Sequence, residues 1–425
     1  MTAHASLGRR QFLAASALGL TFGVWTSART EGRRKRVAFL GTECRNLSHA
    51  QHFLDRMAMG YAWASRWEAP RVDLASVYMD QHPRGDLTPS RLERYKLRSY
   101  PTIAEALTLG GSKLAVDGVV IIAEHGDYPR NDKGQTLYPR YEFFKQVVKV
   151  FEDSGRSVPV FNDKHLSTTW VRCQEMVADS RRLGFPFMAG SSLPVTWRFP
   201  SIDMPHNTPL KESVCVGYGG VDSYDFHGLE TAQCMSERRQ GGEVGVAQVQ
   251  ALRGRAMWER LARSEHESTR RLMLAALGRS HNLPVDRGYP SAPISMEWAQ
   301  QQFPEMLAYF VEHRDGFRTT LFLASIRDFN YAGLRADNGE IISCQMYLPM
   351  PTHGSTTADF FTPLVRHIET MFLENRSVYP IERTLLTSGM VIAAVDSLHR
   401  AQVPISTPEM NVAYKVGPDS FFRRE

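Results

Sequence analysis

The chain has 425 residues, 43% of them hydrophobic and 22% charged, which is ordinary for a soluble globular protein and enough for two domains. Its net charge of +5 is small for this length, so the composition offers no basic surface for nucleic acid. The five cysteines are widely spaced and form no CxxC pair, which argues against a disulfide framework and against a structural zinc site.

The first 28 residues have the pattern of an export signal. Arg9 and Arg10 precede an apolar run over residues 12–25, and the small residues Thr26-Ser27-Ala28 follow it. The run is too short to form a stable membrane span, and paired arginines followed by Phe-Leu are typical of a twin-arginine signal. We expect the twin-arginine machinery to export the folded chain and residues 1–28 to be removed, which gives a periplasmic or secreted protein.

Strands and helices alternate along residues 33–195. Apolar runs predict strands over 35–41, 71–80, 116–123, 158–162 and 185–192. Apolar residues at helical spacing predict helices over 49–67, 100–107, 138–154 and 167–183, with a long polar loop over 81–98. This alternation is typical of a Rossmann-like α/β domain with a doubly wound parallel sheet.

The pattern changes after residue 195. A connector rich in proline and polar residues covers 198–209, and longer amphipathic strands follow over 243–252, 317–326 and 340–347. Helices are predicted over 256–277 and 360–373. We therefore expect residues 196–425 to form an α+β domain that binds the substrate, with a largely antiparallel sheet.

Ionisable side chains follow two of the predicted parallel strands directly. Glu124 and His125 come after the strand at 116–123, and Asp163, Lys164 and His165 end the strand at 158–162. Ligands of open α/β sheets bind at the carboxyl ends of the strands. The sequence thus predicts a site at this edge, although a solvated turn would show the same residues.

Two motifs resemble those of the Gfo/Idh/MocA oxidoreductases. The stretch Pro159-Val-Phe-Asn-Asp-Lys164 is similar to the strand end that carries the family's catalytic lysine, with His165 in place of a proline. The stretch Gly219-Gly-Val-Asp-Ser-Tyr-Asp-Phe-His227-Gly-Leu-Glu230 is similar to the family's helix with a catalytic histidine, with Ser223 in place of the first acid. The resemblance implies that Lys164 and His227 act as an acid/base pair in the oxidation or reduction of a carbohydrate or polyol.

The resemblance also implies hydride transfer with NAD(P). Its binding residues would be Gly41 and Thr42 after the first strand, Asp80 after the second, and Glu124 and His125 after the third. The sequence departs from the family here, because the chain reads Gly41-Thr-Glu-Cys-Arg-Asn where G-x-G-x-x-G is expected. Those glycines normally let the backbone approach the pyrophosphate closely.

The same residues are also compatible with other functions. Histidines and acids near the strand ends are suitable ligands for a divalent metal, with His165 and Glu230 as the named candidates. A metal-dependent or cofactor-free sugar lyase, epimerase or isomerase is the alternative enzyme, and a periplasmic ligand-binding protein without catalysis is the third hypothesis. A homo-oligomer is left open, and no nucleic acid is expected as a partner.

Overall fold

The computed structural model describes residues 33–284, 293–348 and 358–425. Lys35–Glu425 forms one compact unit. The signal peptide expected over residues 1–28 lies outside the described residues and remains a prediction. In the described ranges, no helix is long and apolar enough to cross a membrane.

The first sheet has five parallel strands in the order β4-β1-β5-β6-β7. The bounds of these strands are Arg36–Gly41 for β1, Asp73–Met79 for β4, Gly118–Ile122 for β5, Val160–Asp163 for β6 and Phe187–Gly190 for β7. The central strand β5 is buried along its whole length, because both faces of the sheet are covered, and this explains its run of valine and isoleucine. The parallel, doubly wound half of the predicted fold class is confirmed.

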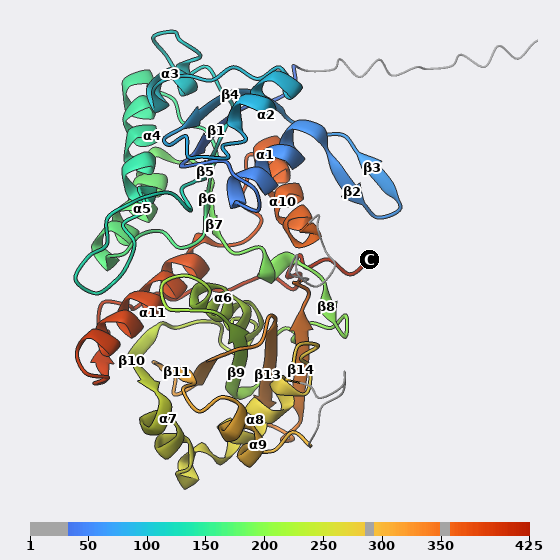
Figure 1. The fold of residues 1–425 in the computed structure, drawn as a ribbon, viewed down its shortest axis with the longest axis vertical. Helices are drawn as coiled ribbons and strands as arrows, with labels where there is room; N and C mark the ends of the chain where they lie inside the picture. Colours follow the sequence, from blue (N-terminus) through green and yellow to red (C-terminus); the bar gives the residue numbers. More distant parts are fainter. Residues whose placement is uncertain (1–32, 285–292, 349–357) are drawn as a thin grey trace, which may run out of the picture. The chain divides into compact units, whose positions relative to one another are not determined.

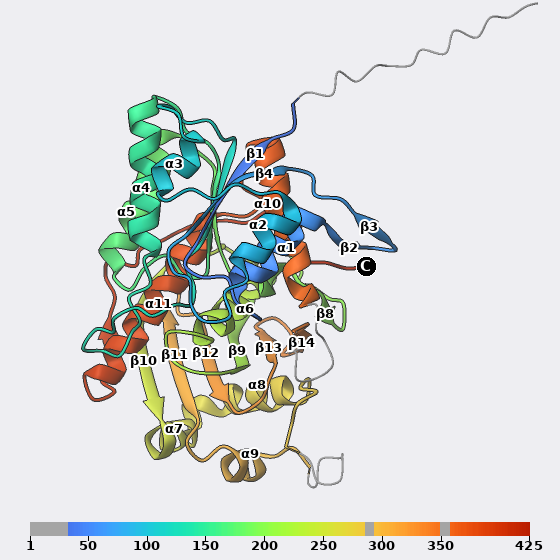
Figure 2. The same ribbon diagram turned by 45° about the horizontal axis from the view of Figure 1, so that its top comes forward.

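Helices cover both faces of this sheet (Figures 1 and 2). One face packs against α3 (Ile103–Thr108), α4 (Arg140–Ser154) and α5 (Trp170–Leu183). The other packs against α1 (His49–Met59) and α10 (Thr362–Glu374). Helix α10 follows most strands of the second sheet in the sequence but packs on the first sheet. The domain boundary predicted between residues 195 and 196 is not tested by this packing and remains a prediction.

The helix predicted over 49–67 is shorter than expected. Helix α1 ends at Met59, and Gly60 follows with a φ of +99°. A Cβ at Gly60 would lie 2.2 Å from the carbonyl oxygen of Glu68, so only glycine allows the chain to turn here. The next residues form a hairpin of β2 (Tyr61–Trp63) and β3 (Arg66–Glu68). A second helix, α2, lies within the polar loop that follows β4, at Thr88–Tyr95.

The second sheet has eight strands in the order β15-β10-β11-β12-β9-β13-β14-β8. Its pairs are antiparallel except β12 with β9, which confirms the α+β half of the fold class. The strands are β8 Arg198–Phe199, β9 Leu210–Tyr218, β10 Val246–Arg253, β11 Leu307–His313, β12 Arg318–Ala324, β13 Phe329–Arg335, β14 Ile341–Met346 and β15 Ile405–Ser406.

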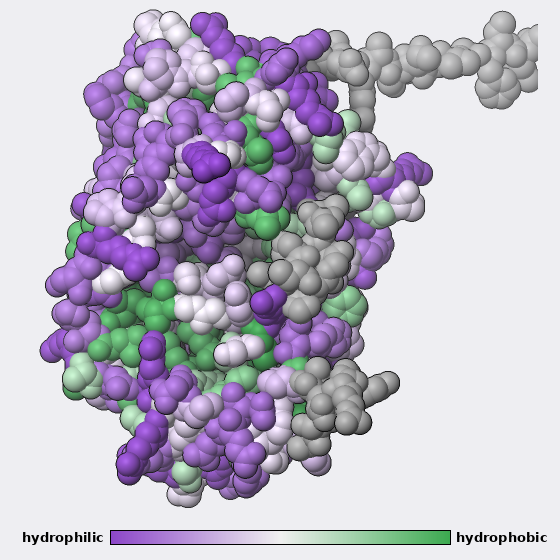
Figure 3. All heavy atoms as spheres, in the orientation of Figure 1, coloured by the Kyte–Doolittle hydropathy of each residue, from purple (hydrophilic) through white to green (hydrophobic). Residues whose placement is uncertain are grey.

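Helices also flank the second sheet. One face packs against α6 (Asp225–Ser236) and α11 (Ile381–His399). The other face packs against α7 (Gly254–Leu261), α8 (Glu267–Leu277) and α9 (Met296–Gln302). The single helix predicted over 256–277 is therefore wrong in detail, because the chain breaks between α7 and α8. Figure 3 shows hydrophobic residues gathered on one face over β10, β11 and α11, but the homo-oligomer that the sequence left open remains untested.

Candidate functional site

A buried ion pair joins the carboxyl ends of β5 and β6. Lys164 Nζ lies 3.3 Å from Glu124 Oε1, and the side chains of both residues are less than 10% exposed. The two strands are hydrogen-bonded neighbours, which brings the residues that follow them together. Lys164 and His125 have φ values of +65° and +72°, so the backbone bends sharply at both strand ends.

Glu124 remains a carboxylate in this setting. Burial alone would raise its pKa, but the positive charges of Lys164 and Arg140 outweigh burial and hold the pKa well below the usual range. Arg140, in the first turn of α4, donates a hydrogen bond to Glu124 Oε2. The carboxylate is therefore available to pair with Lys164 at the strand ends.

Lys164 also reaches the helix of the second motif. Its Nζ donates a hydrogen bond to the backbone oxygen of Ser223 at 3.4 Å and lies 5.4 Å from the centre of the Tyr224 ring. Both residues precede α6 directly, and α6 carries His227. The two sequence motifs, separated by some 60 residues in the chain, thus meet in space.

His227 is a neutral imidazole held by one hydrogen bond. Its Nδ1 lies 2.6 Å from Ser191 Oγ, just after β7. Burial lowers the pKa of His227 well below the usual value, and the nearby charge of Lys164 lowers it further. The side chain is therefore uncharged at neutral pH and able to accept a proton.

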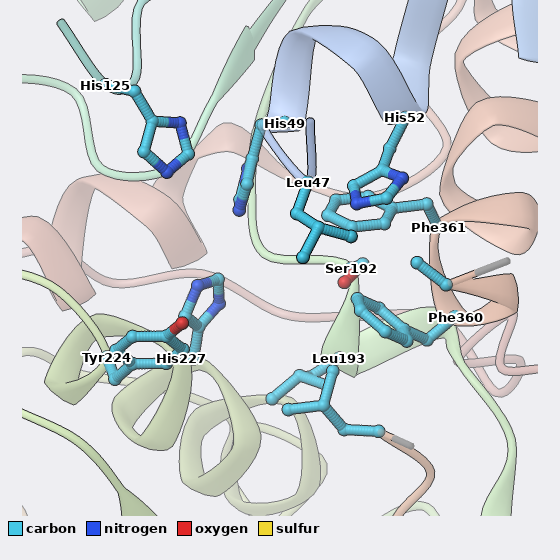
Figure 4. Close-up of a pocket in the computed structure, with 12 residues that line it drawn as sticks. Leu47, His49, His52, His125, Ser192, Leu193, Tyr224, His227, Phe360 and Phe361 are labelled. Atoms are coloured by element: carbon cyan, nitrogen blue, oxygen red, sulfur yellow. The ribbon is translucent and has the colours of Figure 1, made fainter. Parts of the chain in front are cut away.

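His227 faces a cavity of about 190 Å³, here named the histidine cavity. Its polar lining consists of His49, His52, His125, Ser192, Tyr224 and His227. Leu47, Leu193, Leu348, Ala358, Phe360 and Phe361 form the apolar lining. Figure 4 shows the rings of His49, His125 and His227 directed into the same space.

Sequence reasoning missed His49 and His52 as parts of the site. His49 Nδ1 lies 2.6 Å from Asp163 Oδ2, which links the first turn of α1 to the end of β6. The His52 ring stacks on Phe361 with centroids 5.0 Å apart, and burial lowers the pKa of His52 to about 3. The two histidines are three residues apart at a predicted helix start, which would place them on one helical face and could have identified them.

His165 and Glu230, the metal-ligand candidates, do not line the histidine cavity. His165 Nε2 lies 3.1 Å from a guanidinium nitrogen of Arg140, a contact with a cation that disfavours a metal at this nitrogen. Glu230 accepts hydrogen bonds from the hydroxyls of Thr387 and Thr384 on α11, at 2.8 and 3.2 Å. In the described part of the chain, no three histidine, cysteine or acidic side chains form a group that could hold a metal ion. The metal hypothesis therefore finds no support here.

The turn after β1, expected to hold a pyrophosphate, is closed by its own contacts. Thr42 N donates to Ile122 O at 3.2 Å, and Thr42 Oγ1 donates to Glu124 O at 2.9 Å. A Cβ on Gly41 would lie 2.7 Å from Met79 Sδ, so the space beside this glycine is filled by protein. At the start of α1, Ser48 Oγ already accepts a hydrogen bond from the backbone of Gln51.

Asp80, expected to hold a ribose, is also engaged within the protein. Its carboxylate accepts hydrogen bonds from the hydroxyls of Tyr78 at 2.7 Å and Tyr128 at 2.6 Å. Tyr128 belongs to the loop between β5 and α4, and the Gln81 side chain ties this loop to the end of β4 through Asp127. The hydrogen-bonding groups of Thr42 and Asp80 are therefore engaged within the protein, at the position where a dinucleotide would usually lie.

Comparisons in sequence find no relatives: no protein family model matches the chain, and no curated protein matches it. Solved structures do match in fold. GenD2 from gentamicin A biosynthesis, in complex with NAD, has a TM-score of 0.54 at 12% identity, covering 88% of this chain and 96% of that chain. Myo-inositol dehydrogenase from Lactobacillus casei, in complex with NAD(H) and myo-inositol, has a TM-score of 0.53 at 9% identity, covering 91% of this chain and 99% of that chain.

A myo-inositol dehydrogenase from Corynebacterium glutamicum has a TM-score of 0.52 at 11% identity, covering 88% of this chain and 98% of that chain. At these identities the likeness establishes the fold. The fold that the resemblance to Gfo/Idh/MocA oxidoreductases implied is therefore confirmed. One fold hosts many reactions, so the function must come from the site.

Proposed function

We propose that this chain is an enzyme that acts on a hydroxylated, carbohydrate-type substrate in the histidine cavity, with His227 and Lys164 as its acid/base pair. The observation that carries the proposal is a buried, neutral His227 that faces the histidine cavity from α6, with the buried Lys164 at the end of β6 close enough to lower the imidazole pKa. An ionisable group that has a strongly shifted pKa and lines a cavity is typical of an active site.

His227 accepts the proton of the substrate, and Lys164 stabilises the charge that remains on the substrate. A substrate hydroxyl beside His227 gives its proton to Nε2, and the bonding electrons stay on the oxygen. Nε2 can accept only if Nδ1 carries the ring proton and donates it to Ser191 Oγ, 2.6 Å away. Lys164 stabilises the negative charge that forms on the substrate oxygen, while Glu124 holds the lysine side chain in place.

The same two side chains serve two reactions, which are oxidation of the hydroxyl and removal of a proton from a carbon next to a carbonyl group. Oxidation of the hydroxyl to a carbonyl needs a hydride acceptor, the role that NAD(P) fills in such chemistry, and the similar structures with bound NAD favour this reaction. A lyase, epimerase or isomerase needs no hydride acceptor, and the closed turn after β1 favours that second reaction. The NAD(P)-dependent oxidoreductase remains the first candidate by likeness of fold, and NAD(P) itself remains a prediction.

One experiment separates the two. Purified protein is incubated in D₂O with a panel of inositols and monosaccharides, with and without NAD(P)⁺. Oxidation predicts NAD(P)H absorbance and a carbonyl product only when the nucleotide is present. Proton-transfer chemistry predicts deuterium at carbon or a rearranged product without nucleotide. Binding without any conversion would contradict the proposal and support the ligand-binding protein instead.

We also propose that the chain is exported by the twin-arginine route. The support is the paired Arg9 and Arg10 ahead of a short apolar run within residues 1–28. N-terminal sequencing of the protein from its source should begin near residue 29, and replacing both arginines by lysine should keep the uncleaved chain in the cytoplasm. Unchanged processing of that variant would contradict export by this route.

A further inference from the structure

A second depression, here named the outer groove, lies beside the histidine cavity. Three of the eight most exposed large hydrophobic side chains in the described part of the chain line it: Leu47 at 45%, Met59 at 43% and Trp67 at 60% exposure. Such side chains are normally scattered singly over a surface. Their gathering in one groove, with Asn46 and Asp359 among its polar lining, indicates a binding surface.

The outer groove depends on the unexpected hairpin. Gly60 ends α1 and lets the chain fold back as β2 and β3, and β3 carries Trp67. Met59, the last residue of α1, also lines the groove. An exposed tryptophan presented on a short hairpin contributes little to a core, so its position is best explained by a ligand.

The outer groove and the histidine cavity adjoin each other. Leu47 and His52 line both of them. The groove has about 400 Å³, roughly twice the 190 Å³ of the cavity. The side chains of Leu47 and His52 therefore lie between a substrate seated beside His227 and the groove that Trp67 lines, which has room for a further group of at least the same size.

We propose that the outer groove is a second carbohydrate subsite, which binds the next ring of a substrate whose first ring occupies the histidine cavity. A sugar ring combines an apolar face of C–H groups with a polar edge of hydroxyls. The indole of Trp67 offers a large apolar face with a polar handle, and Asn46 and Asp359 offer hydrogen-bonding groups. The substrate class that follows is a disaccharide or glycoside, and this inference rests on the proposed function.

Calorimetric titration tests the subsite without requiring turnover. Glucose, galactose, mannose, N-acetylglucosamine and myo-inositol are each compared with a disaccharide or glycoside that contains the same ring. We expect at least one two-ring compound to bind tenfold or more tightly than its single ring. Trp67→Ala should remove that gain, whereas Phe199→Ala should keep it, because Phe199 is a 44% exposed aromatic residue that lines neither space.

The outcomes distinguish this inference from the proposed function. Equal affinity for one and two rings, or a gain that survives Trp67→Ala, overturns the subsite and leaves the proposed function standing. Binding of no carbohydrate of either length overturns both. Met59→Ala serves as a second variant, so the result does not depend on the folding of one mutant, and it should reduce the two-ring gain in the same direction.

Discussion

Lys164 and Glu124 face each other across neighbouring strand ends, with 3.3 Å between the ammonium nitrogen and the nearer carboxylate oxygen. Neither group is isolated, since Arg140 holds the other carboxylate oxygen and Ser223 O accepts from the lysine. Burial of two charges is favourable only when each is well paired. The arrangement therefore holds the Lys164 side chain close to His227, although Lys164 is not among the residues that line the histidine cavity.

Replacing this lysine should stop catalysis and spare the fold. Lys164→Met removes the charge that stabilises the substrate oxyanion, and we expect kcat/KM to fall by about 100-fold or more. Glu124 remains hydrogen-bonded to Arg140 in this variant, so the free energy of unfolding should change by no more than about 2 kcal/mol. Steady-state kinetics and urea denaturation measure both quantities. Lys149→Met on the exposed face of α4 is the control, and equal kinetics for the two variants would remove Lys164 from the mechanism.

Ser191 should act as a positioning residue for His227. Ser191→Ala removes the hydrogen bond at Nδ1 and leaves the imidazole free to rotate or change tautomer, so kcat should fall about tenfold to 100-fold. KM should change little, because Ser191 does not line the histidine cavity. Ser191→Thr retains the hydroxyl and should restore most of the activity. A pH–rate profile for Ser191→Ala that matches wild type in both height and shape would contradict this role.

Glu230 should make stability depend on pH. Burial raises its pKa from the usual 4.5 to about 7, an effect that the charge of Arg383 only partly offsets. A raised pKa means that the folded state favours the protonated acid, so this stabilisation is complete below about pH 4.5 and is lost as pH rises through 7. Linkage puts the loss on the order of 3 kcal/mol.

Glu230→Gln should remove that dependence, because glutamine keeps an oxygen for the hydroxyls of Thr384 and Thr387 without taking a charge. Thermal unfolding measured from pH 4.5 to pH 7.5 should show a smaller decline in the melting temperature for this variant than for wild type. Parallel curves for the two proteins would mean that Glu230 is not the titrating group.

Gly190 should be intolerant of any side chain. Its φ is +120°, and a Cβ would lie 2.7 Å from Glu230 Oε2 and 2.8 Å from Thr384 Oγ1. Gly190→Ala should therefore destabilise the fold by about 2 kcal/mol or more in urea denaturation. Gly155→Ala is the matched control, because its φ of +63° is also left-handed but its Cβ meets no neighbour. The control should lose only about 1 kcal/mol, and equal losses would contradict the close approach at Gly190.

The sequence predicted the first sheet well because its strands are buried on both faces. β1 and β5 read as unbroken apolar runs, and such runs are distinct from any surface segment. β9 was missed because Glu212 and Ser213 interrupt its pattern. Both are buried, and Glu212 is satisfied by Arg318 and Thr269 from elsewhere in the chain. A buried polar side chain with distant partners gives no local signal that it belongs to a strand.

The sequence also predicted some residues of the candidate site and missed others. Glu124, His125 and Lys164 were predicted because topology alone brings the carboxyl ends of parallel strands together. His49 could not be paired with Asp163 in advance, since 114 residues separate them and only the packing of α1 on the sheet joins them. Trp67 was likewise hidden, because the helix predicted over 49–67 gave no hint of a hairpin beyond Gly60.

The measurement that tests the central claim most directly is kcat/KM for His227→Gln on the best substrate of the carbohydrate panel. Glutamine preserves a polar side chain but cannot take up the substrate proton. We predict a fall of about 100-fold to 10,000-fold, the usual contribution of a general base, with the melting temperature close to that of wild type. Activity within tenfold of wild type in a folded His227→Gln protein would contradict the account.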